Sequence, residues 1–540
     1  MLQVIKKSNG CIQISYSPLS TTRLSTTPSS SSSLCQTIFF SQPSLFNMSQ
    51  AYVIYDERME LHQDGNEATR NERIERPERI ISIMEKLIAL QSRLQLYRQL
   101  NDTRRSAGEA ISMHSYEGRK DVPNLTPSKP PFIHLTCKPA TKQMIELAHS
   151  TEYYNKVKET SFLTAEQLKG LPTINCTPTD TPREIEKDDD MYFCNETFLA
   201  AQLACGGVVQ CVEAVTSPTA ETKRALAVVR PPGHHACRDL AMGFCFFNSV
   251  VVAAKHAINT QRAKKVAILD FDVHHGNGSQ DLTYHDKDIL YISIHRRDGK
   301  KCFPGTGDPN EVGGGNSHPD AIGLNVNIAW RYGNMGNVEY AAAMSELVLP
   351  LLRGFDADLV IISAGFDAAR GDLIGDCDVM PDMYYFMTVS ILKALDDIPL
   401  VVALEGGYNT DVIACCMEAV ALALLNEKWD EDGTKYCDAT PQDKNCVDAG
   451  NLLKDGRMVF SAYWDHYSSN ESERGKIKNS AVKDINKTIR CLIGLPFWCD
   501  LVKLGQIPAQ FSTAKRVTRS RSKIEESLDL IDTSMQSLSL

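Results

Sequence analysis

The chain has 540 residues, of which 57 are basic and 67 are acidic, so its formal net charge at pH 7 is −10. Hydrophobic residues make up 43% and charged residues 23%, which is the composition of an ordinary globular protein and excludes a chain that is disordered throughout. The acidic balance excludes a broadly basic surface for direct nucleic-acid binding. No unbroken apolar run reaches the ~18 residues of a bilayer span, so we expect no membrane-spanning helix.

The 17 cysteines are an odd number and share no repeated spacing. The one adjacent pair, Cys415 and Cys416, lies in a segment with helical periodicity, where neighbours do not bridge easily, and no CxxC pair occurs. This pattern is typical of reduced, intracellular thiols rather than of a disulfide framework, and it argues against a zinc ribbon.

Residues 1–47 contain no Asp or Glu, three basic residues and a serine run. Two interpretations fit this composition, a transit-like leader for an organelle and a disordered leader, and Met48 is an alternative start. We expect a catalytic domain over residues 48–426 and a C-terminal extension, 427–540, with a basic, serine-rich tail. The basic cluster at residues 515–523 fits a nuclear import signal, although a solvated charged tail is the more common explanation.

In chain order, residues 78–100 and 142–160 have the periodicity of amphipathic helices, and the Pro- and Thr-rich stretch 124–138 between them predicts a loop. Two more helical segments, 249–260 and 339–353, alternate with short apolar runs. These runs are residues 225–229, 266–269, 289–293, 359–362 and 400–404. Because the runs are apolar throughout rather than alternating, they predict an α/β domain with a parallel sheet covered by helices on both faces.

Ligands of open α/β sheets bind beyond the carboxyl ends of the strands, and polar residues gather at those positions. The segments that follow four of the runs are RPPGHH at 230–235, DFDVHHGNG at 270–278, SAGFD at 363–367 and EGGYN at 405–409. Parallel strands end at the same edge of a sheet, so this pattern predicts that His, Asp and Tyr side chains from four strands meet in one site.

Three of these residues predict a metal site. Asp272 and His274 are two positions apart on an extended segment and therefore face the same way, and Asp367 adds a carboxylate from another strand. Two carboxylates and one imidazole suit a catalytic divalent metal ion, above all zinc, with a position left for water. Each residue alone fits a helix cap or a satisfied core group equally well, but the whole set favours the metal.

The remaining polar residues are suited to acid–base chemistry. His234 and His235 follow a rigid Pro-Pro-Gly turn, and paired imidazoles beside a metal-bound water are natural general acid and base groups. Asp270 is placed to support one ring, and Asn277 to orient the other without adding charge. Tyr408, behind a Gly-Gly turn, is placed to stabilise an oxyanion. Together these residues predict metal-assisted hydrolysis of an amide.

With these motifs the sequence resembles the zinc-dependent histone deacetylases of class II. The matching motifs, in the family's order, are RPPGHHA (230–236), MGFCFFN (242–248), DFDVHHGNG (270–278), FPGTGD (303–308), SAGFDAARGD (363–372) and LEGGYN (404–409). The resemblance covers roughly residues 50–426. It implies an arginase/deacetylase-like fold with a central eight-stranded parallel sheet, long loops that form a narrow tube, and removal of acetyl groups from lysine side chains.

The resemblance also implies a role for each site residue. His235 is the general base and acid, His234 is mainly electrostatic and supported by Asp270, Asn277 partners the second histidine, and Tyr408 polarises the acetyl carbonyl. The implied ligands of one Zn²⁺ are Asp272, His274 and Asp367.

Two further sets of residues follow from the resemblance alone. The residues implied to line the substrate passage are Phe244, Phe303, Gly243, Gly406, Ile374 and Asp190. A monovalent-cation site, normally occupied by K⁺, is implied at Asp270, Asp272, His274, Ser293 and Ile294.

The sequence departs from the family's pattern near the implied entrance. The His-Pro expected ahead of the PER motif at 77–79 is replaced by Arg73 and Ile74, which puts the entrance loop in doubt and not the metal. A Cys/His cluster for a second, structural zinc is not evident around His62. Animal class IIa enzymes carry His in place of the catalytic tyrosine, whereas this chain keeps Tyr408.

Three functions compete for this chain. We favour an active deacetylase of histones or other acetylated proteins over an acetylpolyamine deacetylase that uses the same metal site. Ile374 takes the position at which the acetylpolyamine branch carries a glutamate. A corepressor scaffold with little turnover, which binds acetylated partners or recruits corepressor complexes, is disfavoured by the intact metal and acid–base residues. We expect the protein in the nucleus, the cytoplasm or both, or in an organelle if the leader directs it there.

Overall fold

The structure is a computed structural model that describes residues 50–105, 129–171, 174–176, 191–396, 398–427 and 477–503. All of these residues belong to the unit Met48–Leu540. The leader 1–47, the basic cluster 515–523 and Asp190 lie outside the described residues, so what we expect of them stays a prediction.

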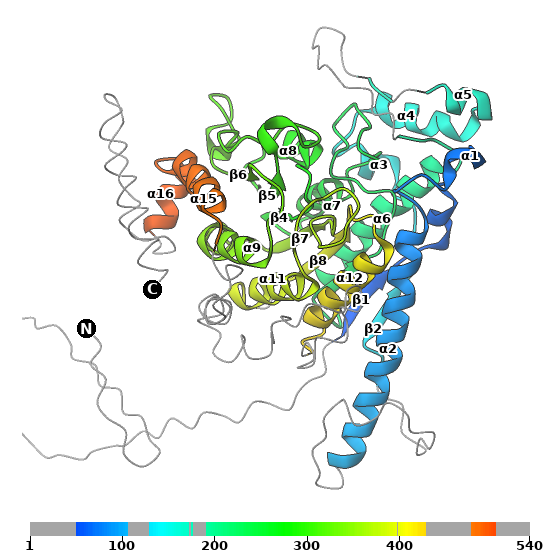
Figure 1. The fold of residues 1–540 in the computed structure, drawn as a ribbon, viewed down its shortest axis with the longest axis horizontal. Coiled ribbons are helices and arrows are strands. Elements are labelled where there is room, and N and C mark those ends of the chain that lie inside the picture. The colour runs from blue at the N-terminus through cyan, green and yellow to red at the C-terminus, as the bar shows by residue number, and fades with distance from the viewer. Residues whose placement is uncertain are drawn as a thin grey trace, which may run out of the picture. The chain divides into compact units, whose positions relative to one another are not determined.

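Eight strands form one sheet, in the order β2-β1-β3-β8-β7-β4-β5-β6, and every pairing is parallel (Figure 1). The strands are β1 Ala51–Ile54, β2 Phe132–Leu135, β3 Arg224–Ala227, β4 Val266–Asp270, β5 Ile289–Arg296, β6 Asn325–Trp330, β7 Leu359–Ala364 and β8 Leu400–Leu404. Strands β3, β4, β7 and β8 are buried along their whole length, because both faces of the sheet are covered. The predicted eight-stranded parallel α/β fold is therefore confirmed.

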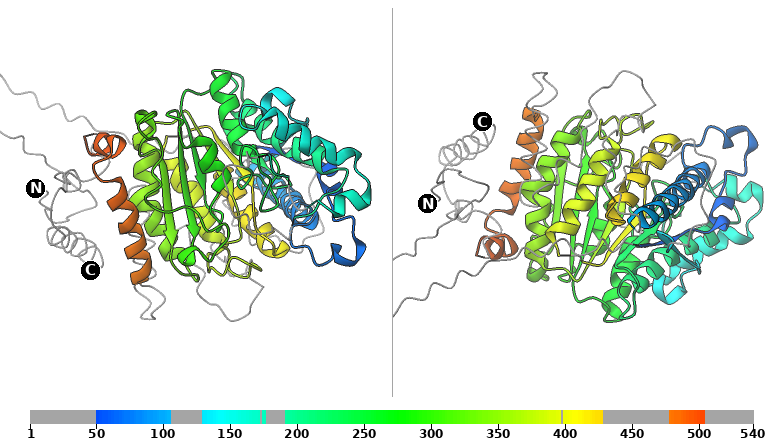
Figure 2. Two further views of the ribbon diagram at one scale, coloured as in Figure 1. Left: turned by 90° about the horizontal axis from the view of Figure 1, so that it is seen from above. Right: turned by 90° about the horizontal axis from the view of Figure 1, so that it is seen from below.

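Helices cover both faces of this sheet (Figure 2). On one face α6 and α7 pack together, and on the other α12 packs against α2 and α11. The helices are α1 Glu67–Arg70, α2 Glu78–Arg105, α3 Lys142–Ile145, α4 Thr151–Glu159, α5 Ala165–Lys169, α6 Thr197–Val215, α7 Ser249–Asn259, α8 Asn277–Thr283, α9 Asn337–Ala343, α10 Leu349–Phe355, α11 Pro381–Ala394, α12 Thr410–Leu424, α15 Asn479–Leu492 and α16 Pro496–Lys503.

Helix α6 is the one helix of the described residues that is long and apolar enough to cross a membrane. However, 72% of its apolar window is buried inside the protein, where it packs on α7, β1 and β3. Its apolar character is therefore explained by its place in the core.

Two of the predicted elements are wrong. The stretch 124–138 was expected to be a loop, but its residues 132–135 form β2, a four-residue edge strand that pairs only with β1. The expected helix 142–160 is divided into α3 and α4, because the Ser150 side chain accepts the N–H of Tyr153 and begins a new helix. In the break, His149 turns into the core and binds the main chain of Cys237 and Asn248.

Several elements of the fold were not predicted, among them the helices α6 and α11 and the strands β1 and β6. The two strands are defined by their parallel pairing, β1 with β3 and β6 with β5. The helical segment 339–353 is confirmed, but it contains a π-helical turn at Met344–Val348. Pro350 follows directly in α10 and has no N–H to donate, which favours such a local change in helical pairing.

Helix α15, from the C-terminal extension, packs along the edge strand β6 (Figure 2). The Asp484 carboxylate accepts from the main-chain N–H of Arg331 at 3.0 Å and from its guanidinium, and the Thr488 hydroxyl donates to the main-chain oxygen of Asn327 at 2.8 Å. An exposed sheet edge is prone to pair with other chains, and α15 covers this one.

Candidate active site and metal centre

The polar residues predicted at the strand ends meet at the carboxyl edge of the four adjacent strands β3, β8, β7 and β4. Strand β4 ends on Asp270 and leads into the segment 271–278; β7 leads into Asp367 and β8 into Tyr408. The tandem histidines follow β3. Because the strands are parallel and adjacent, residues far apart in the sequence converge on one buried site.

Asp272, His274 and Asp367 form a tight cluster whose ligand atoms all lie within 4.8 Å of one another. Nδ1 of His274 lies 3.0 Å from Oδ2 of Asp367 and 3.2 Å from Oδ1 of Asp272. All three side chains are buried. A Cβ on Gly406 would collide with Asp367 and lie 2.5 Å from Oδ2 of Asp272, so only glycine lets the main chain approach this cluster.

The charges of this cluster fit a divalent cation. Burial and the neighbouring Asp272 raise the pKa of Asp367. Burial opposes the charged form of His274, but Asp367 and Asp272 outweigh it and raise the pKa of the imidazole. Without a cation, the crowding of the two buried carboxylates therefore favours the binding of protons at Asp367 and His274. A bound cation of charge +2 would take the place of these protons, and the oxygen and nitrogen donors match the ligands of zinc.

The tandem histidines have different partners and opposite pKa shifts. Nδ1 of His234 lies 3.1 Å from Oδ2 of Asp270, and Nδ1 of His235 lies 2.8 Å from Oδ1 of Asn277. Burial opposes charging of His234, but Asp272 and Asp270 outweigh it and raise its pKa to about 10. Burial and then the charge of His234 lower the pKa of His235. One ring therefore stays charged and the other neutral, which separates their chemical roles.

Tyr408 is buried at 5% exposure and lies on the turn after β8. Its main-chain N–H donates to Oδ2 of Asp372 at 2.7 Å, the Arg79 guanidinium lies 5.0 Å from its ring centroid, and the ring of Phe244 lies edge-on at 5.7 Å. Burial raises the pKa of the Tyr408 phenol, so the hydroxyl keeps its proton and remains a hydrogen-bond donor.

The residues expected to line the substrate passage lie around this site. The ring of Phe303 lies 5.0 Å from that of His235 and is 40% exposed. Gly243 has φ of +55°, and a Cβ there would collide with His235 and lie 3.0 Å from Phe303. Ile374 is also 40% exposed, and its N–H donates to Oδ1 of Asp372 at 2.9 Å.

The residues expected at the monovalent-cation site lie together on β4 and β5. Asp270 and Ser293 are direct partners in the pairing of these strands, and Ile294 follows Ser293. Asp272 and His274 continue the chain from β4. The Ser293 hydroxyl lies 2.9 Å from Nδ1 of His295, and Tyr291 donates its hydroxyl to Asp270 at 2.8 Å.

The structure shows two buried carboxylates beside the site, Glu405 and Glu75, to which the sequence analysis gives no role. Oε2 of Glu405 accepts the main-chain N–H groups of Gly233 and His234 at 2.7 and 3.1 Å, and so holds the histidine loop. Glu75 is fully buried between Arg79 and Arg230, with contacts of 2.9 and 2.8 Å. Glu405 directly follows a predicted strand, which was a usable signal, whereas nothing around Glu75 in the sequence marks it.

His62 is buried beside Tyr192, Cys194 and Thr197. Its Nδ1 lies 3.1 Å from the Thr197 hydroxyl and 3.6 Å from the Cys194 sulfur, and its ring stacks on Tyr192 at 4.6 Å. No group of three potential metal ligands within the described ranges includes His62. Burial lowers the pKa of His62 to about 3, so the ring is a neutral group of the core.

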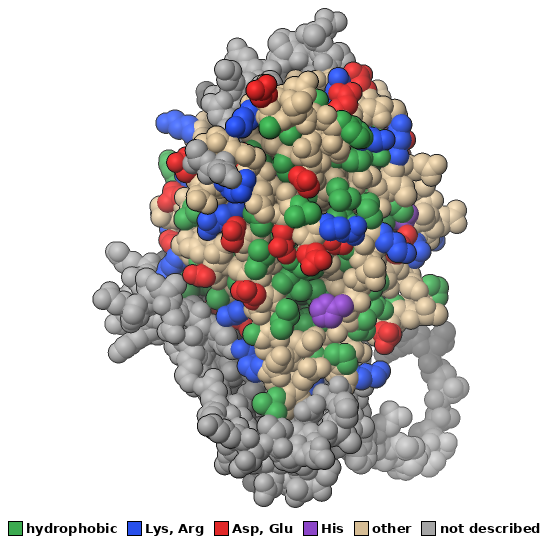
Figure 3. Space-filling model, turned by 90° about the vertical axis from the view of Figure 1, so that its right-hand side faces the viewer, with side chains coloured by type: hydrophobic (Ala, Val, Ile, Leu, Met, Phe, Trp, Pro, Cys, Tyr) green, Lys and Arg blue, Asp and Glu red, His purple; other side chains and the backbone are tan. Residues whose placement is uncertain are grey.

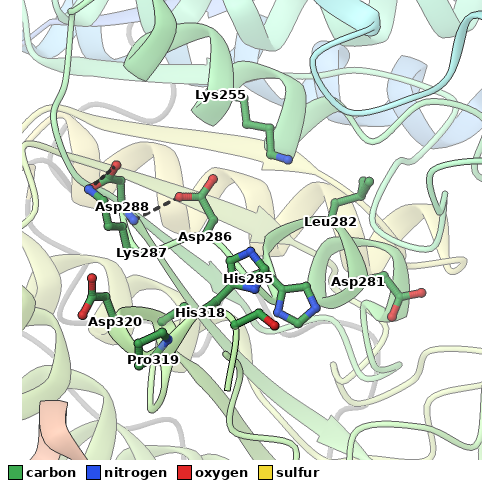
Figure 4. Close-up of a pocket in the computed structure, with 12 residues that line it drawn as sticks. Lys255, Asp281, Leu282, His285, Asp286, Lys287, Asp288, His318, Pro319 and Asp320 are labelled. Atoms are coloured by element: carbon green, nitrogen blue, oxygen red, sulfur yellow. Dashed lines mark hydrogen bonds and ion pairs between the residues drawn. The ribbon is translucent and has the colours of Figure 1, made fainter. Parts of the chain in front are cut away.

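A separate pocket lies near the C-terminal end of α8 (Figure 4). The rings of His285 and His318 stack there at 4.6 Å and 28° from parallel, and Lys287 pairs with Asp288 at 2.8 Å. Stacked rings hold their nitrogen lone pairs side by side rather than aimed at one point. The pocket shares no residue with the metal cluster, and we assign it no part in the chemistry.

The fold is that of the arginase/deacetylase class of α/β proteins. The histone deacetylase domain model matches residues 75–424, and the chain belongs to the histone deacetylase family, within class II. The predicted family is thus confirmed.

Relatives in fungi, plants and animals agree with this assignment. Histone deacetylase HDA1 of Saccharomyces cerevisiae is 37% identical over 65% of this chain and 47% of its own length, and histone deacetylase 15 of Arabidopsis thaliana is 40% identical over 55% and 49%. Human histone deacetylase 7 is 42% identical over 49% and 27%. The matched region thus spans about half or less of each relative. The crystal structure of the HDA15 HD domain superposes with a TM-score of 0.59 at 29% identity, covering 85% of this chain and 98% of that one.

Proposed function

We propose that the protein is a zinc-dependent hydrolase that removes acetyl groups from lysine side chains of histones or other proteins. The observation that carries this proposal is the buried Asp272–His274–Asp367 cluster beside two histidines of opposite pKa shift. The family to which the chain belongs depends on zinc, and the donor set and charge of the cluster fit that ion. Asp272, His274 and Asp367 would hold it, and zinc would supply a Lewis acid for the acetyl carbonyl and the attacking water.

The residues of the chain would carry the proton transfers. His235, which stays neutral, takes the proton of the attacking water and later delivers it to the leaving lysine amine. His234 stays charged beside Asp270 and stabilises the negative charge that develops. Tyr408 donates its hydroxyl to the carbonyl oxygen as it becomes an oxyanion. Phe244 and Phe303 enclose the apolar stem of the acetyl-lysine.

The monovalent-cation site is part of this proposal. K⁺ would be held by Asp270 and Ser293, with Ile294 and the main chain of Asp272 and His274. The direct pairing of Asp270 with Ser293 across β4 and β5 supports the assignment. Its role would be to offset part of the negative charge of Asp270, which is buried beside His234.

Acetylated proteins are the proposed substrates, and corepressor complexes are the proposed partners. Charged side chains of both signs are interspersed with apolar ones on the face drawn in Figure 3, which fits a protein partner better than a nucleic acid. Asp190, proposed to grip the substrate main chain, lies outside the described residues. We propose the nucleus, the cytoplasm or both as the location, and a targeting role for the leader remains a proposal of the same kind.

One assay tests the proposal against its competitors. Purified zinc-loaded protein is incubated with an acetyl-lysine peptide, with acetylspermidine or with buffer, and released acetate is measured. We expect acetate from the peptide, and its loss on chelation of zinc. Turnover of acetylspermidine alone would favour a polyamine enzyme, and no turnover of either would favour a scaffold.

A further inference from the structure

The side chain of Asn277 is held from two sides in the active site. Its Oδ1 lies 2.8 Å from Nδ1 of His235, while its Nδ2 donates to two sulfur atoms, Sγ of Cys237 and Sδ of Met242, each at 3.3 Å. Asn277 and Cys237 are each only 6% exposed, so water does not compete freely for the amide. Both sulfurs come from the short loop that follows His235.

The two sulfurs distinguish between the two ends of this amide. A thioether carries no hydrogen, so Met242 can only accept a hydrogen bond. The thiol hydrogen of Cys237 is directed to the main-chain oxygen of His235 at 3.7 Å or to the carboxylate of Asp281 at 3.6 Å, which leaves sulfur lone pairs toward Asn277. If the side-chain amide of Asn277 were rotated by half a turn, its oxygen would face two hydrogen-bond acceptors. Its NH₂ group would then face His235 instead.

The orientation of the amide decides which nitrogen of His235 carries the proton. Oδ1 of Asn277 has no hydrogen to give, so a neutral His235 must donate from Nδ1 and keep Nε2 unprotonated. We propose that Cys237 and Met242 are positioning residues that, through Asn277, hold His235 in the tautomer with its proton on Nδ1. The importance of this tautomer for catalysis rests on the proposed function, because the general base needs a free lone pair on Nε2.

A double substitution, Cys237→Ala with Met242→Leu, tests the proposal in two backgrounds. In the otherwise natural chain, kcat for an acetyl-lysine peptide should fall about three- to tenfold with KM changed less than about twofold, because two weak hydrogen bonds no longer bias the amide. In an Asn277→Asp background both ends of the side chain are oxygens, so the same substitutions should leave kcat unchanged or raise it. Cys205→Ala with Met344→Leu, which removes buried sulfurs elsewhere, is the matched control.

Nuclear magnetic resonance of ¹⁵N-histidine-labelled, zinc-loaded protein reads the tautomer directly. The His235 signals are those that disappear in His235→Gln. We expect the proton on Nδ1 in the natural chain and a mixture of tautomers in the double variant. An unchanged tautomer in that variant, or an equal loss of kcat in both backgrounds, would overturn the proposal. A natural chain without turnover would contradict the proposed function, and the tautomer measurement would still decide this inference.

Discussion

The carboxylate of Asp372 ties the main chain of Tyr408 to that of Ile374. Its Oδ2 accepts the Tyr408 N–H at 2.7 Å, and its Oδ1 accepts the N–H groups of Ile374 and Gly375 at 2.9 and 3.1 Å. The turn that carries the proposed oxyanion donor and the loop proposed at the mouth of the substrate passage are thus held by one side chain. Loss of this side chain should therefore release the loop and the turn from one another.

Asp372→Ala should therefore lower kcat by about tenfold, because a small misplacement of a catalytic group is costly. Asp372→Asn keeps an oxygen on one side and should lose less. The measurement is kcat on an acetyl-lysine peptide together with zinc content, which should stay at one per chain. Loss of zinc in Asp372→Ala would instead mean that the residue supports the metal cluster.

Asp367→Ala should abolish tight zinc binding, since it removes one of three proposed protein ligands and a negative charge. Zinc content after dialysis, measured by atomic emission, should fall well below one per chain. Asp500→Ala, an exposed aspartate paired with Lys503, is the control and should keep the metal. Stoichiometric zinc and near-normal turnover in Asp367→Ala would show the ligand assignment to be wrong.

Tyr408→Phe should lower kcat by about a hundred- to a thousandfold and leave KM nearly unchanged, because the lost hydroxyl acts on the developing oxyanion. Tyr332→Phe, at a tyrosine that is 64% exposed, should change neither constant. Steady-state kinetics on the peptide decides the matter. Unchanged turnover with weaker substrate binding would make Tyr408 a wall of the passage instead.

Ile374→Glu should raise the specificity constant for acetylspermidine relative to that for an acetyl-lysine peptide. A carboxylate there can pair with the secondary ammonium of the polyamine, whereas isoleucine leaves that charge unpaired in a confined space. Leu373→Glu places the same charge one residue away, at a side chain that is 59% exposed, and should shift the ratio less. A natural chain that already prefers acetylspermidine would contradict this prediction.

His149 should make folding weaken as the pH falls. Only a neutral imidazole can donate from Nδ1 to the oxygen of Cys237 at 3.0 Å and accept the N–H of Asn248 at Nε2 at 2.9 Å. Burial lowers its pKa from 6.5 to about 4. Below pH 6.5, His149 therefore binds a proton in the unfolded chain but stays neutral in the folded protein. The stability is fully present above pH 6.5 and is lost progressively down to pH 4, by about 3 kcal/mol in total.

The variant His149→Gln can donate and accept in the same place but does not titrate. Urea unfolding of both proteins at pH 7.5, 6.5 and 5.5 gives the two free energies of unfolding. The advantage of the natural chain should shrink by up to about 1.4 kcal/mol per pH unit below 6.5. A difference that stays constant with pH would mean that His149 has the same pKa in the folded and the unfolded chain.

Much of the site was predictable because its residues follow local patterns. The runs that became β3, β4, β5, β7 and β8 are apolar throughout, which is what a sheet covered on both faces requires. Since parallel strands end at one edge, the spacing of Asp272 and His274 and the residues after β7 and β8 were enough to bring Asp367 and Tyr408 to the same place.

The tertiary structure alone decided the rest. Strands β1, β2 and β6 are short or mixed in composition, and they are defined by partners distant in the sequence. Glu75 contacts Arg79 and Arg230 only because folding buries it between them. The orientation proposed for Asn277 depends on two sulfurs, of Cys237 and Met242, that only the folded chain brings to its amide. Sequence periodicity reports which face of an element is apolar, but the partner of a buried charge or amide depends on long-range packing.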